Sequence, residues 1–297
     1  MENTTPKLGI IESDPWLEPY SAAIEGRHQH ALDKELELTG GKGTLSDFAT
    51  GYLYFGLHRT RRGWVVREWA PNAKEIYLIG DFNDWKEHGD YRMYHVKNSP
   101  GVWEVELQSG AIKHGDLYKL KVRWNGGEGE RIPAWANRVV QDEQTKIFSA
   151  QVWEPENPYR FRKKVFRAKT DPLMIYECHI GMAQEEERVG TYNEFREKIL
   201  PRIAEAGYNC IQIMAIQEHP YYGSFGYHVS SFFAPSSRFG TPDELKELID
   251  TAHRMGIAVI MDIVHSHAVK NEVEGLGNFA GDPNPVSYTH LTLPTIR

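Results

Sequence analysis

The sequence has 297 residues, of which 40% are hydrophobic and 25% are charged, and its formal net charge is −7. This length is enough for one large or two ordinary domains, and the composition is typical of a folded rather than a disordered protein. The negative charge disfavours a nucleic acid or an anionic membrane as a partner and favours a neutral ligand. No apolar run approaches the ~20 residues that a membrane helix needs, and the N-terminus has no signal-peptide pattern.

The two cysteines indicate the compartment. Cys178 and Cys210 each lie within or beside an apolar run, so each is expected to be a buried free thiol. Because free thiols are typical of a reducing environment, they predict a cytoplasmic protein.

Residues 1–48 are predicted to form a helical N-terminal segment. Apolar residues recur at helical spacing over 14–38, which indicates one helix. Asp14 can cap its N-terminus, and Pro15 suits the first helical position. The helix is expected to end at Gly40 and Gly41.

The hydrophobic period changes to that of β-strands in residues 49–152. Several short β-type runs are separated by turn sequences such as Arg62-Gly63. Such a series within ~100 residues predicts an antiparallel β-sandwich. The expected strands are 52–55, 64–66, 75–79, 102–107 and 118–122.

A stretch rich in proline and charge, 153–172, is predicted to be a linker, and an α/β pattern follows it. Nearly continuous apolar strands alternate with helices, which indicates a parallel sheet covered by helices. A (β/α)₈ barrel and a doubly wound sheet both fit this pattern. The expected strands are 173–178, 208–216 and 257–264, and the expected helices are 192–206 and 242–255.

Polar residues follow the third of these strands, in the segment DIVHSH. Asp262 and His267 would lie where the loops of a barrel build an active site. A purely structural role is the alternative, in which Asp262 braces a loop and the histidines cap the sheet. A His-X-His segment can also bind zinc or iron, but the other two strand ends offer no matching ligands, so no metal is expected.

The loop after the second strand, EHPYYGSFGYH in residues 218–228, holds four aromatic residues and two glycines. Its rings are expected either to line a cleft and stack on sugars or to pack against the loop's own barrel. The residues by themselves leave both readings open.

The segments from Asn209 to Gly281 resemble the α-amylase superfamily, and within it the glycogen and starch branching enzymes. The resemblance is carried by NCIQIMAIQEH, YYGSFGYHVSSFFAPSSRFGTPDELKELIDTAHRMGI, DIVHSHAVKN and EGLGNFAGD. Upstream, REWAPNAKEIYLIGDFNDW is similar to the carbohydrate-binding sandwich of that family. The resemblance covers roughly 14–284. It implies an immunoglobulin-like sandwich followed by the first three βα units of an incomplete (β/α)₈ barrel in 173–284.

The resemblance also implies functional residues. Asp262 would organise the floor of the active site, His267 would hydrogen-bond the glucose ring at the cleavage point, and Tyr227 would stack on that ring. The sandwich positions implied to bind α-1,4-glucan, such as glycogen, amylose and maltooligosaccharides, are Trp69, Pro71, Trp85, Gly101 and Lys121.

The family forms α-1,6 branches by retaining glycosyl transfer, which needs a nucleophile and an acid/base carboxyl group and no cofactor. In the family these groups, and a further Asp, follow the fourth, fifth and seventh barrel strands, so none is expected in this chain. Residues 285–297 depart from the family pattern and are expected to be foreign or out of frame. The fragment is therefore expected to be inactive. Alternatives are a glucan-binding fragment without catalysis and an α-glucan hydrolase of the same superfamily.

Overall fold

The computed structural model describes residues 8–168, 172–265 and 267–281. The chain divides into two units, with the boundary between Leu53 and Tyr54. The prediction for residues 285–297 lies outside the described residues.

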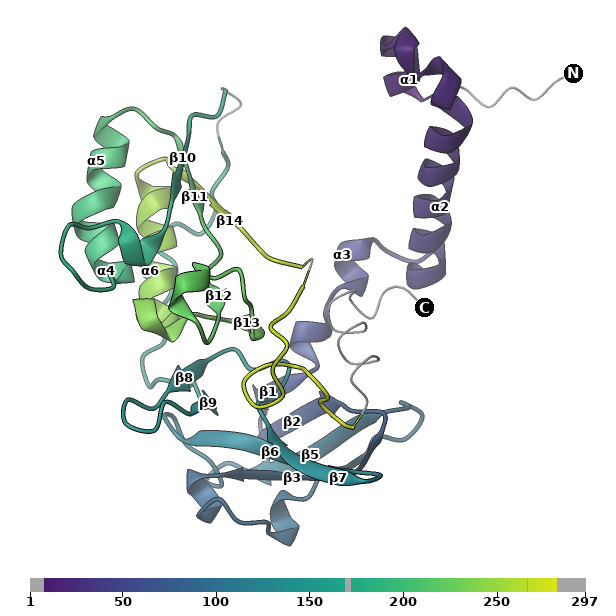
Figure 1. The fold of residues 1–297 in the computed structure, drawn as a ribbon, viewed down its shortest axis with the longest axis vertical. Coiled ribbons are helices and arrows are strands. Elements are labelled where there is room, and N and C mark those ends of the chain that lie inside the picture. The colour runs from purple at the N-terminus through teal and green to yellow at the C-terminus, as the bar shows by residue number, and fades with distance from the viewer. Residues whose placement is uncertain (1–7, 169–171, 266, 282–297) are drawn as a thin grey trace, which may run out of the picture. The chain divides into compact units, whose positions relative to one another are not determined.

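The first unit is helical, as predicted. Asp14 caps a 3₁₀ helix, η1 (Pro15–Tyr20), by accepting a hydrogen bond from the Trp16 N–H at 3.0 Å. This turn is 3₁₀ rather than α-helical, and Pro19 inside it has no N–H for an α-helical hydrogen bond. The regular helix α2 ends at Gly40, which adopts the left-handed conformation (φ 60°). The elements are α1 (Gly9–Ser13), η1, α2 (Ser21–Thr39), α3 (Leu45–Phe48) and η2 (Gly51–Leu53) (Figure 1).

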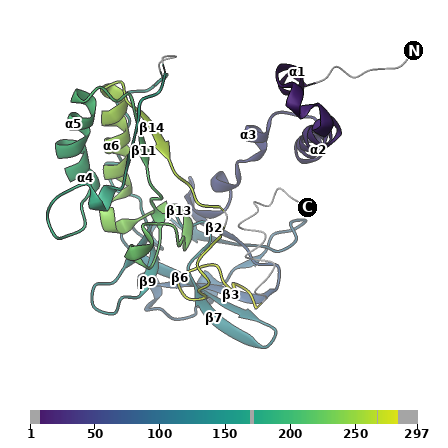
Figure 2. The same ribbon diagram turned by 45° about the horizontal axis from the view of Figure 1, so that its top comes forward.

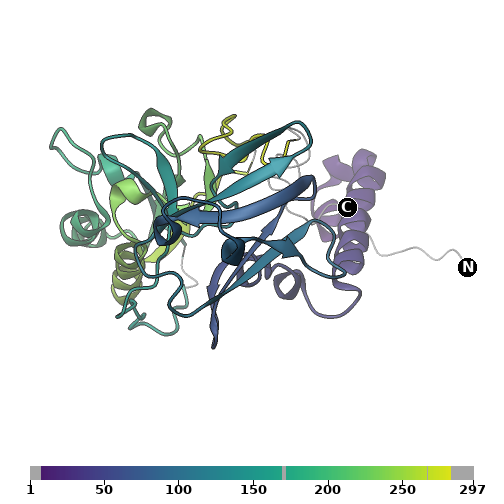
Figure 3. The ribbon, with the colours of Figure 1, turned by 90° about the horizontal axis from the view of Figure 1, so that it is seen from below.

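The second unit begins with the predicted sandwich of two antiparallel sheets, which Figure 3 shows from below. The first sheet has the order β1 (Gly56–Arg59), β2 (Gly63–Trp69), β5 (Val102–Gln108), β4 (Tyr94–His95). The second has the order β3 (Ala73–Gly80), β6 (Leu117–Trp124), β9 (Phe148–Gln151), β8 (Val139–Gln141), and β7 (Gly127–Arg131) also pairs with β6. Short 3₁₀ helices cover Asp81–Asn83 and Gly89–Tyr91.

Four of the five predicted sandwich strands are confirmed, and the strand predicted at 52–55 is wrong. Residues Gly51–Leu53 form a 3₁₀ turn, and the first strand starts at Gly56. The Phe55 ring stacks on Trp135 with ring centroids 5.2 Å apart. Aromatic enrichment therefore reflects a tertiary contact here rather than a strand.

A carboxyl group is fully buried within the sandwich. Glu68 on β2 is fully buried, and it accepts hydrogen bonds from the backbone N–H groups of Trp69 at 3.0 Å and Ala134 at 2.7 Å. Burial raises the pKa of Glu68 to about 8 despite these two donors. A buried acid is stable here because both of its oxygens have partners.

Glu68→Gln is expected to flatten the pH dependence of unfolding. The folded chain retains a proton that the unfolded chain releases above pH 4.5, because burial raises the pKa from 4.5 to about 8. The free energy of unfolding should thus fall, on the order of a few kcal/mol, as pH rises through this window. Urea unfolding at pH 5 and pH 8 measures the fall. Glu106→Gln, at an exposed position on β5, is the control, and its free energy of unfolding should still fall between pH 5 and pH 8. An equal fall in Glu68→Gln would contradict the assignment of this pH dependence to Glu68.

The α/β pattern forms a parallel sheet in the order β10 (Ile175–Cys178), β11 (Cys210–Ile213), β14 (Ala258–Met261). Its helices lie together on one side in both views of Figures 1 and 2, and they share an apolar core with the strands. The helices are α4 (Tyr192–Glu194), η6 (Phe195–Ile199, a π-helix), α5 (Leu200–Glu205) and α6 (Pro242–Arg254), with 3₁₀ turns at Ile180–Met182, Tyr222–Ser224 and Ser237–Phe239. A hairpin of β12 (Gln217–Glu218) and β13 (Ser231–Pro235) completes this part.

The three parallel strands and both helices are where the sequence predicted them, but the strands are shorter. The register with β11 ends at Met261, so Asp262 lies just beyond the ladder. In the described part of the chain, β10 and β14 each pair only with β11. Ile260 and Met261 on β14 are 38% and 44% exposed, so β14 presents apolar side chains to the surface at this edge of the sheet.

The segment predicted as a linker is anchored to helix α6. The carboxylate of Asp250, which is fully buried, accepts hydrogen bonds from the Tyr159 hydroxyl at 2.7 Å and from the backbone N–H groups of Arg162 and Lys163 at 3.0 and 2.8 Å. The described part of 153–172 forms no helix or strand, as a linker should, but its path is fixed by contacts with α6. The Tyr159 N–H also donates to Asp243 Oδ2 at 3.2 Å, and Phe166 stacks on His253 with ring centroids 4.2 Å apart.

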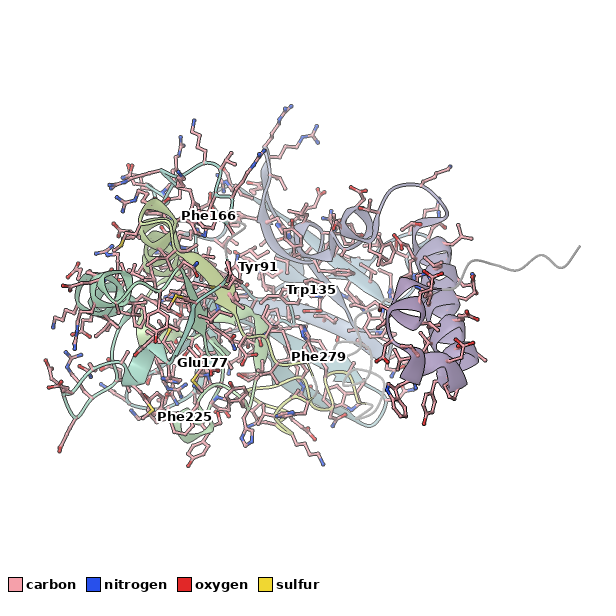
Figure 4. The ribbon with its side chains drawn as sticks, turned by 90° about the horizontal axis from the view of Figure 1, so that it is seen from above. Tyr91, Trp135, Phe166, Glu177, Phe225 and Phe279 are labelled. Atoms are coloured by element: carbon pink, nitrogen blue, oxygen red, sulfur yellow. The ribbon has the colours of Figure 1, made fainter. Side chains whose placement is uncertain are left out.

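The sandwich packs against the hairpin that follows the second parallel strand. Trp135, labelled in Figure 4, stacks on Phe233 of β13 with ring centroids 4.1 Å apart. Phe279, also labelled, belongs to the apolar core of the sandwich. Segments distant in the sequence therefore share one core.

Candidate functional site

Three of the predicted residues meet at the carboxyl ends of the parallel strands. The Tyr227 hydroxyl donates to Asp262 Oδ2 at 2.8 Å. His267 Nε2 lies 2.7 Å from the backbone oxygen of Tyr227, to which it can donate a hydrogen bond. Asp262 directly follows β14, and its own N–H donates to the Ile213 oxygen at the end of β11. The structure thus links a carboxylate, a phenol and an imidazole in one hydrogen-bonded series.

The loop reaches this position because of a glycine. Gly226 has φ 92°, and a Cβ atom there would lie 1.7 Å from the backbone oxygen of Ala215. Only a residue without a side chain permits this approach of the loop to the end of the second strand. Tyr227 follows immediately and packs with Val229 and Val264.

Tyr227 is held as a hydrogen-bond donor. Burial, and then the hydrogen bond to the Asp262 carboxylate, raise the pKa of Tyr227 to about 12. The phenol is therefore protonated at neutral pH, and its partly buried ring is oriented by Asp262. His267 is exposed beside it. A polar, partly aromatic surface of this kind can contact the hydroxyl groups and ring face of a sugar.

Gln217, which the sequence patterns did not predict, stabilises this site. Gln217 donates from Nε2 to the Phe232 oxygen at 2.9 Å and accepts from the Val264 N–H at 3.1 Å. It thereby ties the strand-end segment after β14 to the β12–β13 hairpin. The only sequence signal is a polar residue directly after the apolar run 208–216.

The aromatic loop 218–228 contains an exposed ring as well as rings that pack against the neighbouring structure, so both of the predicted arrangements occur. Tyr221 is 64% exposed, whereas Phe225 and Tyr222 pack edge-on against His179, at centroid distances of 5.6 and 6.0 Å. Figure 4 labels Phe225 on this part of the molecule. The Tyr221 ring is available to a ligand, while the other two contribute to packing.

Glu218, at the start of this loop, is structural. It is fully buried and accepts hydrogen bonds from Ser236 Oγ at 3.0 Å and from Ser237 N and Oγ, both at 2.8 Å. Burial raises the pKa of its carboxyl group. Since its oxygens are occupied by the hairpin, Glu218 has no lone pair directed toward a ligand.

In the sandwich, Trp69, Pro71 and Gly101 form one cluster. A Cβ atom at Gly101 would lie 2.9 Å from the Pro71 Cβ and 3.0 Å from the Trp69 Nε1. Gly101 has φ 78° and its oxygen accepts from the Ala70 N–H at 2.8 Å. Glycine at this turn therefore leaves room for the indole of Trp69.

Trp85 and Lys121 belong to the second sheet rather than to this cluster's sheet. Trp85 follows β3 in a left-handed conformation (φ 58°), is 37% exposed, and donates from Nε1 to Asp81 Oδ1 at 3.0 Å. Lys121 on β6 forms an ion pair of 2.6 Å with Glu128 on the neighbouring strand. The five sandwich positions thus divide into a compact group of three and two residues elsewhere.

Ranges 8–168, 172–265 and 267–281 contain no group of three or more His, Cys, Asp or Glu side chains arranged to hold a metal ion. Among the helices of these ranges, none combines the length and apolar character needed to cross a membrane.

Comparison with protein families gives two matches along the chain. Residues 54–136 match carbohydrate-binding module 48 (isoamylase N-terminal domain), and residues 181–274 match the alpha amylase catalytic domain. The first covers most of the sandwich, and the second contains Tyr227, Asp262 and His267.

Curated relatives match nearly the whole chain. The 1,4-alpha-glucan-branching enzyme of Dictyostelium discoideum is 44% identical over 278 residues, which are 92% of this chain and 40% of that protein. The enzyme of the same name from Rhizophagus irregularis is 45% identical over 289 residues, which are 94% of this chain and 41% of that protein. The chain thus spans about two fifths of the length of the curated relatives it matches.

Solved structures resemble the fold. The pullulanase from Bacillus acidopullulyticus superposes with a TM-score of 0.60 at 17% sequence identity, covering 80% of this chain and 31% of that one. At this identity, the likeness concerns the fold alone.

Proposed function

We propose that this chain, as a member of the family of 1,4-alpha-glucan-branching enzymes in the α-amylase superfamily, binds α-1,4-linked glucan through its sandwich. The observation that carries this proposal is the cluster of Trp69, Pro71 and Gly101, where a glycine at positive φ makes room for an indole. An indole face and a proline ring offer the apolar C–H surfaces on which a glucose ring stacks.

We further propose the division of the chain that its sequence predicted. The sandwich, 49–152, would be an immunoglobulin-like carbohydrate-binding domain between the helical segment 1–48 and the linker 153–172. The parallel strands β10, β11 and β14 would be the first three βα units of a (β/α)₈ barrel, in 173–284. The three-strand parallel order supports this, since barrel neighbours follow chain order.

The reaction of the whole protein would be retaining glycosyl transfer. An α-1,4 bond is cleaved, the glucan segment is held as a covalent glycosyl-enzyme, and the segment is passed to a 6-hydroxyl to form an α-1,6 branch. Asp262 would form the floor of the site, Tyr227 would stack on the ring at the cleavage point, and His267 would hydrogen-bond it. The hydrogen bond from Tyr227 to Asp262 supports this assignment because it orients the ring.

For these 297 residues we propose glucan binding without branch formation. Retaining transfer needs two carboxyl groups ~5–5.5 Å apart. The family resemblance assigns those groups to positions after the fourth and fifth barrel strands, and we expect none of them among these 297 residues. Hydrolysis by the same superfamily scaffold is the second candidate for the whole protein, and the 44–45% identity to branching enzymes favours transfer.

The test combines a binding and an activity measurement on the purified chain. We expect maltoheptaose to bind in isothermal titration, and amylose to show no new α-1,6 linkages after treatment with a debranching enzyme. New branches would contradict the proposed absence of catalysis, and new reducing ends would indicate hydrolysis. An absence of maltoheptaose binding would refute the sandwich proposal.

We also propose a cytoplasmic location. Both cysteines are buried free thiols in the structure, as expected of a protein from a reducing compartment.

A further inference from the structure

The outer face of the first sheet continues from Trp69 to the opposite edge. In the register of this sheet, Arg67 of β2 lies opposite Glu104 of β5, and Glu104 lies opposite Tyr94 of β4. Directly opposed residues point to the same face, as do residues two apart on a strand. Trp69, Arg67, Glu104 and Tyr94 therefore share one face, whereas the alternate positions, such as Trp103, are buried in the core.

The middle of this face carries a charged pair. Arg67 Nε lies 2.5 Å from Glu104 Oε2, and the two side chains are 21% and 27% exposed. The guanidinium also lies over the Tyr54 ring, 4.4 Å from its centroid. This ion pair presents N–H donors and carboxylate acceptors side by side, which suits a ligand whose hydroxyl groups both donate and accept hydrogen bonds.

The far edge of the face ends in an exposed aromatic ring beside a hollow. Tyr94 is 61% exposed and lies on β4, the last strand in the order of the sheet. The hollow has a volume of ≈ 280 Å³, and its lining includes Asp90, Arg92, Tyr94 and Glu106. Large exposed aromatic side chains next to a concavity are typical of binding surfaces.

The spacing of the two aromatic residues fits a chain rather than a single sugar. Trp69 and Tyr94 are separated by two strand spacings across the sheet and by two residues along the strand direction. With strands ~4.8 Å apart and ~3.4 Å per residue, their backbones are about 12 Å apart. A glucan that contacts both must therefore extend over several glucose rings.

The charges of this face favour a neutral ligand. Arg67 and Glu104 compensate one another, and Asp90 and Glu106 outnumber Arg92 around the hollow. A phosphorylated or otherwise anionic ligand would meet net negative charge at the Tyr94 end. An uncharged polyhydroxyl chain would not.

We propose that an α-1,4-linked glucan seated at Trp69 crosses strands β2, β5 and β4 over the Arg67–Glu104 pair and stacks a second glucose ring on Tyr94. This inference rests on the proposed glucan binding at Trp69 and extends it to a site that selects longer chains. Tyr94 thereby determines the dependence of affinity on chain length.

The test compares maltotriose with maltoheptaose by isothermal titration of the full chain. We expect Tyr94→Ala to weaken maltoheptaose binding about tenfold, the loss typical of an aromatic contact residue, and to leave maltotriose binding unchanged. Tyr94→Phe should retain the affinity, because the ring face remains. Tyr20→Ala, which removes a 63%-exposed tyrosine of the helical segment, is the matched control and should change neither affinity.

The outcomes separate this inference from the proposed function. Unchanged binding of both sugars by Tyr94→Ala, together with their loss in Trp69→Ala, overturns the extension and leaves the sandwich proposal standing. An equal loss of both sugars in Tyr94→Ala, with unchanged thermal unfolding, also overturns the chain-length role. If the unmodified chain binds neither sugar, both proposals fail.

Discussion

Trp69→Ala is expected to weaken maltoheptaose binding at least about 30-fold, because truncating a tryptophan at the centre of a binding site typically costs 2 kcal/mol or more. The indole lies beside Gly101 and Pro71, so its removal eliminates the largest apolar surface of this cluster. Isothermal titration with maltoheptaose measures the loss.

Trp16→Ala is the control for this variant. Trp16 is 87% exposed in the helical segment, so its truncation also removes an exposed indole but leaves the sandwich unchanged. We expect it to bind maltoheptaose like the unmodified chain. Equal affinities of Trp69→Ala and Trp16→Ala would show that the glucan binds elsewhere.

Gly226→Ala is expected to destabilise the part of the chain that carries Tyr227 by about 3 kcal/mol or more. The new Cβ atom would lie 1.7 Å from the Ala215 oxygen, so either the loop or the strand end must move. This movement would also break the hydrogen bond from Tyr227 to Asp262. Hydrogen exchange of peptides covering 210–230 should accelerate, and urea unfolding should shift to lower concentration.

Gly207→Ala separates the steric contact from the backbone strain. Gly207 has φ 88°, close to the 92° of Gly226, but a Cβ atom there meets nothing within 4 Å. It should therefore cost only about 1 kcal/mol, the usual price of a left-handed non-glycine residue. Similar losses in the two variants would mean that the close approach to Ala215 contributes nothing.

Local sequence signals predicted the elements of this protein well. Thr241 caps α6 by accepting from the Glu244 N–H, and Pro242 occupies the first helical position. The predicted helix 242–255 accordingly agrees with α6 to within one residue. The end of the N-terminal helix at Gly40 was also predicted correctly, although its first turn, Pro15–Tyr20, is 3₁₀ rather than α-helical. Such signals suffice because caps and turns depend on residues a few positions apart.

The candidate site was predicted only in part. The family resemblance, now supported by relatives at 44–45% identity, named Tyr227, Asp262 and His267, and their glucan-contacting roles stay predictions. Neither Gln217 nor Tyr94 was recognised, because the first acts through distant backbone groups and the second through its strand register.

By itself, the sequence determined the change from sandwich to parallel sheet and the ends of most elements, since these follow from local composition and period. Its ordered segments also carried the resemblance to branching enzymes. Only the tertiary structure decided that Trp69 and Tyr94 share a face, that Glu68 is buried, and that Tyr227 donates to Asp262, 35 positions away. The physical reason is that strand pairing and burial depend on contacts between segments far apart in the chain. No short-range pattern of residues encodes the partner that a strand or a polar side chain will meet.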